Sequence, residues 1–253
     1  MIGQLLAASG LSGTAIALAA AMTFCAAAIR GLTGFGMAII LVPLLGMVIE
    51  PAQAVVLAIL LQLLIGPVGL GTILADGDRA SALPIAGLAM LATPLGLLAL
   101  RATPPDVARL IIAGVAIGAF LLVLLPMRLD GHRPSRAEIG ITGVASGILT
   151  GFAAMPGPPV VPFYLRQRIA PRVARASMML VFFGTAMAGT VSAFAMEAAT
   201  WQTAALAGIL FLPMLVGNWA GGLAFGRIPA VYWRSFVALI LGISGLSAVL
   251  RLW

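Results

Sequence analysis

Long apolar stretches, separated by single charged residues or short polar connectors, run through almost the whole chain. The stretches without a charged residue are 1–29, 31–49, 51–75, 80–100, 110–127, 139–165, 176–196, 198–226 and 235–250. A transmembrane helix needs about 20 largely apolar residues, and most of these stretches are long enough for one crossing. The pattern therefore predicts an all-α polytopic membrane protein.

The longest polar connector lies near the middle of the chain and divides it into two similar halves. We expect a first transmembrane repeat at 1–126, a cytoplasmic linker at 127–137 and a second repeat at 138–253. Short motifs recur in the same order in both halves: Thr33-Gly34-Phe35 as Thr150-Gly151-Phe152, Val42-Pro43 as Val161-Pro162, and Gly96 and Arg101 as Gly222 and Arg227. Such order is typical of an internal duplication.

Each half is expected to contain one broken unit followed by three ordinary spans. The broken units are 11–49 and 138–165, and the spans are 52–74, 81–100, 107–126, 174–196, 201–226 and 231–250. In each broken unit a helix meets Gly and Pro, and a second segment of about a dozen residues follows. At 1.5 Å per residue this segment reaches roughly 20 Å, short of the ~30 Å hydrocarbon core.

The arginines indicate how these units lie in the bilayer. If both units turn back, Arg101, Arg109 and Arg251 lie on one side, and the other side receives Arg79, Arg128, Arg133, Arg136, Arg166, Arg168, Arg172, Arg175, Arg227 and Arg234. If the units cross once, the repeats are parallel and the arginine clusters lie on opposite sides. The positive-inside rule favours the first arrangement, that is, inverted repeats with both termini facing away from the cytoplasm.

Composition narrows the function. Hydrophobic residues make up 62% of the 253 positions and charged residues 8%, against about a quarter charged in soluble domains. The basic residues are all arginines placed between apolar stretches, which argues against nucleic-acid binding. With one cysteine, Cys25, and one histidine, His132, we expect no metal site and no cofactor.

We also expect no enzyme activity, because the spans lack paired acids and a nucleophile with its base. All seven acidic residues fall at span ends or in connectors. If the chain is a transporter of anions, it would therefore work by facilitated movement, or by coupling to an ion that needs no carboxylate in the middle of the membrane. Two alternatives remain open at this point: an integral membrane enzyme such as a lipid phosphatase, and an assembly factor for a membrane complex.

The two broken units are the predicted binding site for a small anion. Gly and Pro interrupt helices there, and the exposed helix N-termini attract anions. Arg30 has two interpretations of equal weight: a charge near the tip of a hairpin inside the membrane, or a cytoplasmic anchor. Asn218 is equally open between substrate contact and packing, whereas Gln62 is interpreted as a bridge between helices. The candidate residues are Arg30, Gly31, Thr33, Gly34, Gly36, Pro43, Thr150, Gly151, Pro156, Gly157, Pro158 and Asn218.

The motifs of the two units resemble those of the sulfite exporter TauE/SafE family of bacterial membrane proteins. The resemblance rests on GLTGFGMAIILVP, its degenerate copy GILTGFAAMPGPPVVP, and the helix ends TPLGLLALR and GNWAGGLAFGR. It implies a multi-pass transporter of the bacterial cytoplasmic (inner) membrane that moves small sulfur-containing anions, such as sulfite or sulfoacetate, by alternating access. The first copy has fewer glycines than is common in the family. The exact substrate, the direction of transport and the oligomeric state, a homo-oligomer included, stay open.

Overall fold

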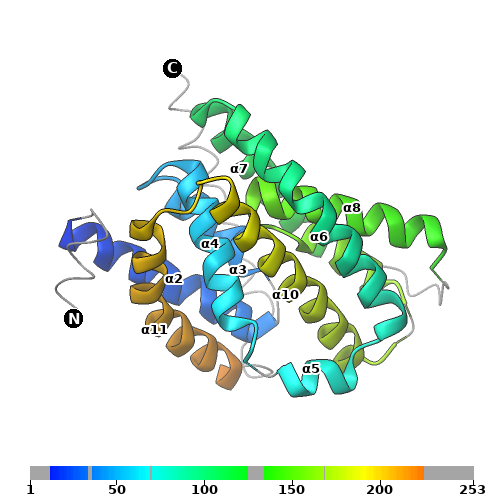
Figure 1. Ribbon diagram of the computed structural model, residues 1–253. Coiled ribbons are helices and arrows are strands. Elements are labelled where there is room, and N and C mark those ends of the chain that lie inside the picture. The colour runs from blue at the N-terminus through cyan, green and yellow to red at the C-terminus, as the bar shows by residue number, and fades with distance from the viewer. Residues whose placement is uncertain (1–11, 34–35, 69, 125–133, 168, 225–253) are drawn as a thin grey trace.

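A computed structural model of the chain describes residues 12–33, 36–68, 70–124, 134–167 and 169–224, and every regular element in these ranges is an α-helix (Figure 1). The helices are α2 (Gly13–Thr33), α3 (Met37–Leu45), α4 (Pro51–Ile65), α5 (Leu70–Asp76), α6 (Arg79–Ala102), α7 (Pro105–Leu124), α8 (Arg136–Ala153), α9 (Gly157–Leu165), α10 (Pro171–Ala195) and α11 (Trp201–Ala224). The all-α prediction is confirmed for these residues.

Several helix starts follow from local sequence chemistry. α4 and α10 begin at Pro51 and Pro171, where a fixed φ suits the first helical position and no hydrogen bond is lost. α8 begins with a capping box: the Ser135 hydroxyl accepts from the Glu138 N–H, and the Glu138 carboxylate accepts from the Ser135 N–H.

Five described helices are long and apolar enough to cross a membrane. They are Gly13–Leu32, Arg79–Ala102, Pro105–Leu122, Arg172–Ala195 and Trp201–Ala224. The last four correspond to the ordinary spans predicted at 81–100, 107–126, 174–196 and 201–226. The span predicted at 231–250 and most of the 127–137 linker lie outside the described residues.

The prediction of one continuous span at 52–74 is wrong. Helix α4 ends at Ile65 and α5 begins at Leu70, with a turn between them. Pro67 lies in this turn; it has no N–H, and in a continuing helix its ring would clash with the preceding turn. Phe183 of α10 packs so closely against Gly66 that an added Cβ would lie 2.0 Å from its ring. The break is therefore built into the packing.

Both predicted broken units are indeed broken in the structure. Helix α2 ends at Thr33 before α3, and α8 ends at Ala153 before α9. The two short helices have nine residues each and contain Pro43 and Pro162, respectively. Nine residues rise about 14 Å, which is less than half of the hydrocarbon core.

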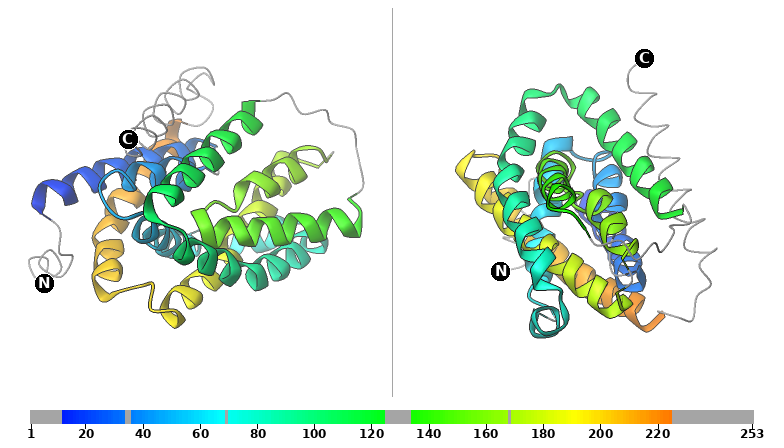
Figure 2. Two further views of the ribbon diagram at one scale, coloured as in Figure 1. Left: turned by 90° about the horizontal axis from the view of Figure 1, so that it is seen from above. Right: turned by 90° about the vertical axis from the view of Figure 1, so that its right-hand side faces the viewer.

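Two pairs of helices pack at main-chain distance: α2 with α11, and α6 with α8 (Figures 1 and 2). The glycines at these contacts are Gly31, Gly217 and Gly221 in the first pair, and Gly96, Gly147 and Gly151 in the second. A Cβ added at any of them would lie 1.9–2.3 Å from a main-chain oxygen of the neighbouring helix, so only glycine permits this approach.

Both helix pairs are parallel, because residue numbers rise together along each contact. The neighbours are Phe24 with Gly217 and Ala28 with Gly221 in the first pair, and Ala89 with Gly147 and Thr93 with Gly151 in the second. The helices of each pair therefore begin at the same end of the molecule.

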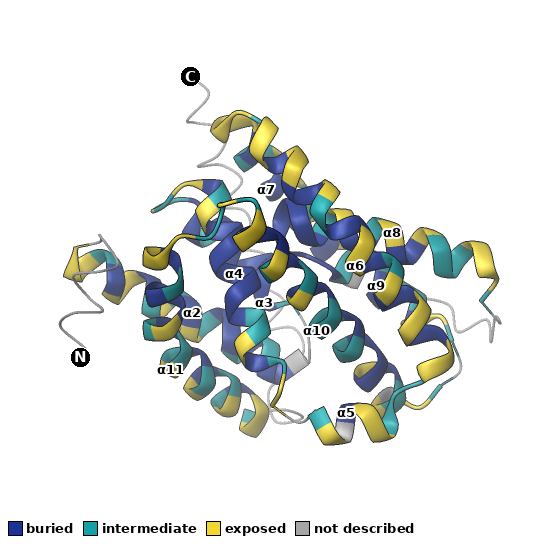
Figure 3. Cartoon of the chain, viewed as in Figure 1, coloured by how far each residue is buried: buried dark blue, intermediate teal, exposed yellow. Residues whose placement is uncertain are grey.

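Burial follows the same organisation (Figure 3). The middle of α4 is completely buried, with no exposure from Ala54 to Ile59, and it packs against α3, α10 and α11. On the outside, Leu91, Val191 and Trp201 are 77%, 69% and 72% exposed. Large apolar side chains on the outer surface match a lipid environment rather than water.

Candidate anion site

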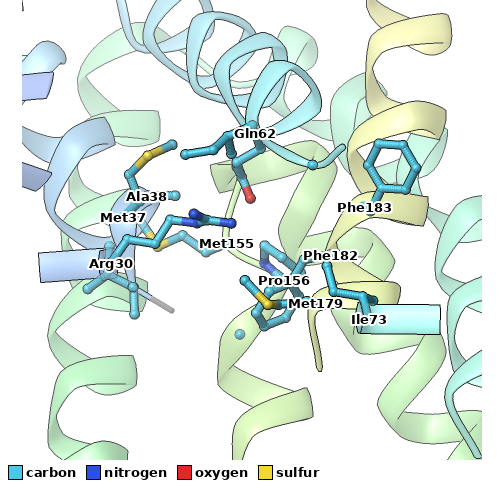
Figure 4. Close-up of a pocket in the computed structure, with 15 residues that line it drawn as sticks. Arg30, Met37, Ala38, Gln62, Ile73, Met155, Pro156, Met179, Phe182 and Phe183 are labelled. Carbon is cyan, nitrogen blue, oxygen red and sulfur yellow. The ribbon is translucent and has the colours of Figure 1, made fainter. Parts of the chain in front are cut away.

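A cavity lies between the breaks of the two broken units, beside the turn that separates α4 from α5 (Figure 4). Its lining includes Gly36 and the first turn of α3, Pro156 and Gly157 before and at the start of α9, and Gln62 of α4. Most of the remaining wall is apolar: Ile65, Ile73, Met155, Met179, Phe182 and Phe183. An apolar wall with a few polar groups is typical of a small-molecule site.

The cavity is small. It offers about 50 Å³ to water-sized molecules, and on this measure one water needs about 10–15 Å³. The size suits a small ion.

The charged group of the cavity is Arg30, in the last turn of α2. Its guanidinium extends into the cavity (Figure 4), and its Nη1 donates a 2.8 Å hydrogen bond to Asn218 Oδ1 on α11. The side chain is half-buried, and among the described residues no carboxylate forms an ion pair with it. A guanidinium has five N–H donors in a planar fork, so donors remain that can hold an oxyanion through two parallel hydrogen bonds.

Main-chain donors complete this side of the cavity. Gly36 precedes α3 with φ of 88°, a left-handed conformation that favours glycine. It lines the cavity together with Met37, Ala38 and Ile39 of the first turn. The first N–H groups of a helix have no acceptor within the helix, and the helix dipole adds positive potential. α3 has no side-chain cap, so these donors are free of that competition.

The start of α9 has a different chemistry. Pro156 precedes the helix, and Gly157 is followed by Pro158 and Pro159, so among residues 156–159 only Gly157 has an N–H. Here carbonyl groups are held instead: the Pro156 oxygen accepts a 3.1 Å hydrogen bond from the buried Ser146 hydroxyl. The second break thus contributes shape and few donors.

Gln62 connects the two sides of the cavity. Its Nε2 donates to Ala154 O at 3.0 Å and to Ala58 O at 3.3 Å. Ala154 itself has φ of 56°, a conformation that non-glycine residues seldom adopt. The amide therefore anchors the second break to α4, in agreement with its interpretation as a bridge between helices.

A comparison with known protein families identifies the chain's relatives. The family model described as "Sulfite exporter TauE/SafE" matches residues 18–248, which is most of the chain. The chain belongs to the sulfite exporter TauE/SafE family. No curated protein and no solved structure matches it in the corresponding comparisons. The family resemblance inferred from the glycine and proline motifs is confirmed.

The structure brings some of the predicted site residues of this TauE/SafE protein together and separates others. Arg30, Gly36, Pro156 and Gly157 line the cavity, and Asn218 touches it only through Arg30.

The other predicted residues have other positions. Gly31 and Gly151 lie at the helix contacts described above, and Thr150 is buried and donates to Ser146 O at 2.7 Å. Pro43 lies inside α3 and Pro158 in the first turn of α9, and neither lines the cavity. Gly34 and the side chain of Thr33 lie outside the described residues.

Sequence reasoning missed several cavity residues. Gly66 and Ile73 were missed as lining residues because the apolar pattern at 52–74 predicts one continuous helix. The Gly66-Pro67 pair was nevertheless a signal of the break. Met155 and the pair Phe182 and Phe183 also line the cavity, although none of them is among the candidate residues named from the sequence. Apolar wall residues carry no signal that separates them from core residues.

Proposed function

We propose that this TauE/SafE protein carries a small anion, a sulfur oxyanion or organosulfonate such as sulfite or sulfoacetate, across the bacterial inner membrane by alternating access. The proposal rests mainly on one observation: the Arg30 guanidinium extends into an apolar cavity between the two breaks, and no described carboxylate pairs with it. A charge inside a membrane protein is costly unless it is paired. A bound anion would supply the missing partner.

The α3 N-terminus supports the same ligand class. It adds main-chain donors and a positive dipole end to the charge of Arg30, while the second break adds few donors because of its prolines. A dianion or monoanion of compact shape fits both the donor set and the size of the cavity.

We further propose that the broken units are re-entrant hairpins that belong to inverted repeats, 1–126 and 138–253. For the first unit, α2 begins at the same end as α11. That end carries Met196, whose carbonyl accepts a hydrogen bond from Arg101 near the end of α6. Gly46, just after α3, accepts a 3.1 Å hydrogen bond from Arg109 near the start of α7. Because α7 follows α6 after a short connection, the contacts of Arg101 and Arg109 lie at the same end of the molecule. This supports a first unit that starts and finishes at that end.

The second unit supports the opposite direction. Helix α8 begins at the same end as α6, and the Tyr164 hydroxyl near the end of α9 lies 3.0 Å from the Ser81 hydroxyl near the start of α6. These contacts support a unit that starts and finishes near the start of α6, at the end opposite to the first unit. Two tips that approach from opposite sides around one cavity are an arrangement suited to alternating access.

The transport proposal is tested with purified protein in liposomes. We expect sulfite, or another anion of a panel with thiosulfate, sulfoacetate and simple carboxylates, to enter faster than into protein-free liposomes. The same anion should raise the thermal stability of the protein in detergent, because it binds the folded state. Transport would be contradicted if no anion of the panel enters the liposomes or stabilises the protein. If a partner protein also co-purifies stably, the result would favour an assembly factor.

A further inference from the structure

The Gln62 amide has a fixed orientation in the cavity wall. Its Nε2 is the atom that donates to the carbonyl oxygens of Ala58 and Ala154. Exchange of the amide nitrogen and oxygen would place Oε1 against these two acceptors, which is unfavourable. The oxygen must therefore lie on the other branch of the amide, and Figure 4 shows it extending into the space between Arg30 and Pro156.

This oxygen is an acceptor without a donor. No described residue donates a hydrogen bond to Gln62 Oε1, although Gln62 is half-buried in a largely apolar cavity. The oxygen faces the cavity, where water can donate to it as long as no ligand is bound. A ligand that displaces this water leaves the acceptor unpaired, at the cost of a desolvated polar group, unless it brings a donor of its own.

The polar groups of the cavity thus form two different sets. Arg30 and the N–H groups at the start of α3 donate, whereas Gln62 Oε1 accepts. An anion whose outer atoms are all unprotonated oxygens satisfies the first set and places lone pairs against Gln62. An anion that also carries a hydroxyl, an N–H group or an acid proton satisfies both sets.

We propose that Gln62 is a specificity-determining residue that selects monoanions carrying a hydrogen-bond donor besides the charged group. Protonated sulfur oxyanions such as hydrogen sulfite, and hydroxy- or aminosulfonates, belong to this class. The inference rests on the proposed anion site and makes its substrate class narrower. Sites that hydrogen-bond a ligand hydroxyl reject analogues without it, because their own polar group is then left unpaired.

Matched ligand pairs test this on the wild-type protein. Isethionate and propane-1-sulfonate have the same charge and nearly the same size, and differ by a hydroxyl in place of a methyl group; glycolate and propionate form the same pair among carboxylates. Apparent Kd values come from ligand-dependent thermal stabilisation of the purified full-length protein. We expect each hydroxylated anion to bind roughly tenfold more tightly than its methyl analogue.

The variant Gln62→Met keeps the length of the side chain and removes the acceptor. It should bind both members of each pair with similar affinity, and the change should come from weaker binding of the hydroxylated anion. A merely structural role of Gln62 would weaken both members equally and leave the ratio unchanged. If Gln62→Met does not fold, the ratio measured on the wild-type protein still decides.

The outcomes separate the two proposals. Equal wild-type affinities for both members of each pair would overturn the role of Gln62 and leave the anion site intact. An unchanged preference in Gln62→Met would overturn it in the same way. No binding of any of the four anions would overturn the anion site and the role of Gln62 together.

Discussion

The two broken units share a framework and differ in chemistry. Each consists of a long helix that packs through glycines on a parallel neighbour, followed by a nine-residue helix with an internal proline. At the tip of the first unit, Arg30 and the free N–H groups of α3 concentrate donors. At the second tip, Pro156, Pro158 and Pro159 remove nearly all of them.

Two units with a common framework can therefore have different roles. The glycine contacts and short helices position both tips, but the guanidinium and most of the main-chain donors lie on one side of the cavity. We therefore assign ligand binding to the first unit, and shape and anchoring to the second. Substitutions at the two tips and at the helix contacts test this division.

The largest effect is expected from Arg30→Gln. The substitution removes the charge and the forked donor set, so anion affinity should fall about 100-fold, with a corresponding loss of flux at low substrate concentration. The control Arg136→Gln changes an exposed arginine at the start of α8 in the same way and should retain transport. Binding and flux at wild-type level in Arg30→Gln would exclude Arg30 from the site.

Glycine substitutions at the helix contacts come next. Gly31→Ala and Gly151→Ala each force a Cβ to about 2.1 Å from a main-chain oxygen and should lower the free energy of unfolding by about 1–3 kcal/mol. Gly140→Ala, with no neighbouring atom within 4 Å, is the control and should be neutral or slightly stabilising. Thermal unfolding in detergent measures this.

The same two variants also separate the two units. Gly31 contacts Asn218, the partner of Arg30, so Gly31→Ala should weaken anion binding as well as stability. Gly151→Ala should affect stability with little change in affinity. Equal losses of affinity in both would contradict the division of roles.

An exchange of proline between the two tips has a smaller expected effect. Ala38 and Pro158 are the second residues of their helices. Ala38→Pro removes one main-chain donor at a position where a helix tolerates proline, so anion affinity should fall roughly tenfold. Pro158→Ala adds a donor at the second tip and should leave affinity within about twofold. Titration of both variants with sulfite compares them directly, and the reverse ranking would place the anion at α9.

The smallest effect concerns the anchoring of the second unit. Tyr164 is completely buried, and its hydroxyl pairs with Ser81. Tyr164→Phe should lower the free energy of unfolding by about 1 kcal/mol and leave anion affinity unchanged. Ser81→Ala should have a similar effect, and the double variant should lose less than the sum of the two. Additive losses would show that the two hydroxyls do not stabilise one another.

The main features of the fold were predictable because they follow from strong local signals. Apolar stretches of membrane length gave four of the spans, and the Gly and Pro clusters marked both breaks. The break after α4 was missed, since Gly66-Pro67 was its one local signal and the tight packing of Phe183 on Gly66 joins segments more than a hundred residues apart. Long apolar runs hide such interruptions when only one proline marks them.

The candidate site was predictable in part. Arg30 is conspicuous as a charge at the edge of an apolar stretch, but its position in a cavity depends on how α2 packs on α11. Gly31 and Gly151 were assigned to ligand binding because glycine permits close approach; in the structure the group that approaches is a neighbouring helix. Sequence alone does not distinguish these two uses of glycine.

The location of a bound anion tests the role of Arg30 and the start of α3 most directly. Crystals of the full-length protein grown with selenite, the heavier analogue of sulfite, would show it by anomalous scattering of selenium. We predict one peak within hydrogen-bond distance of the Arg30 guanidinium and the N–H groups of Met37, Ala38 and Ile39. A cavity without a peak, or a peak at the start of α9 away from Arg30, would contradict anion binding by Arg30 and the start of α3.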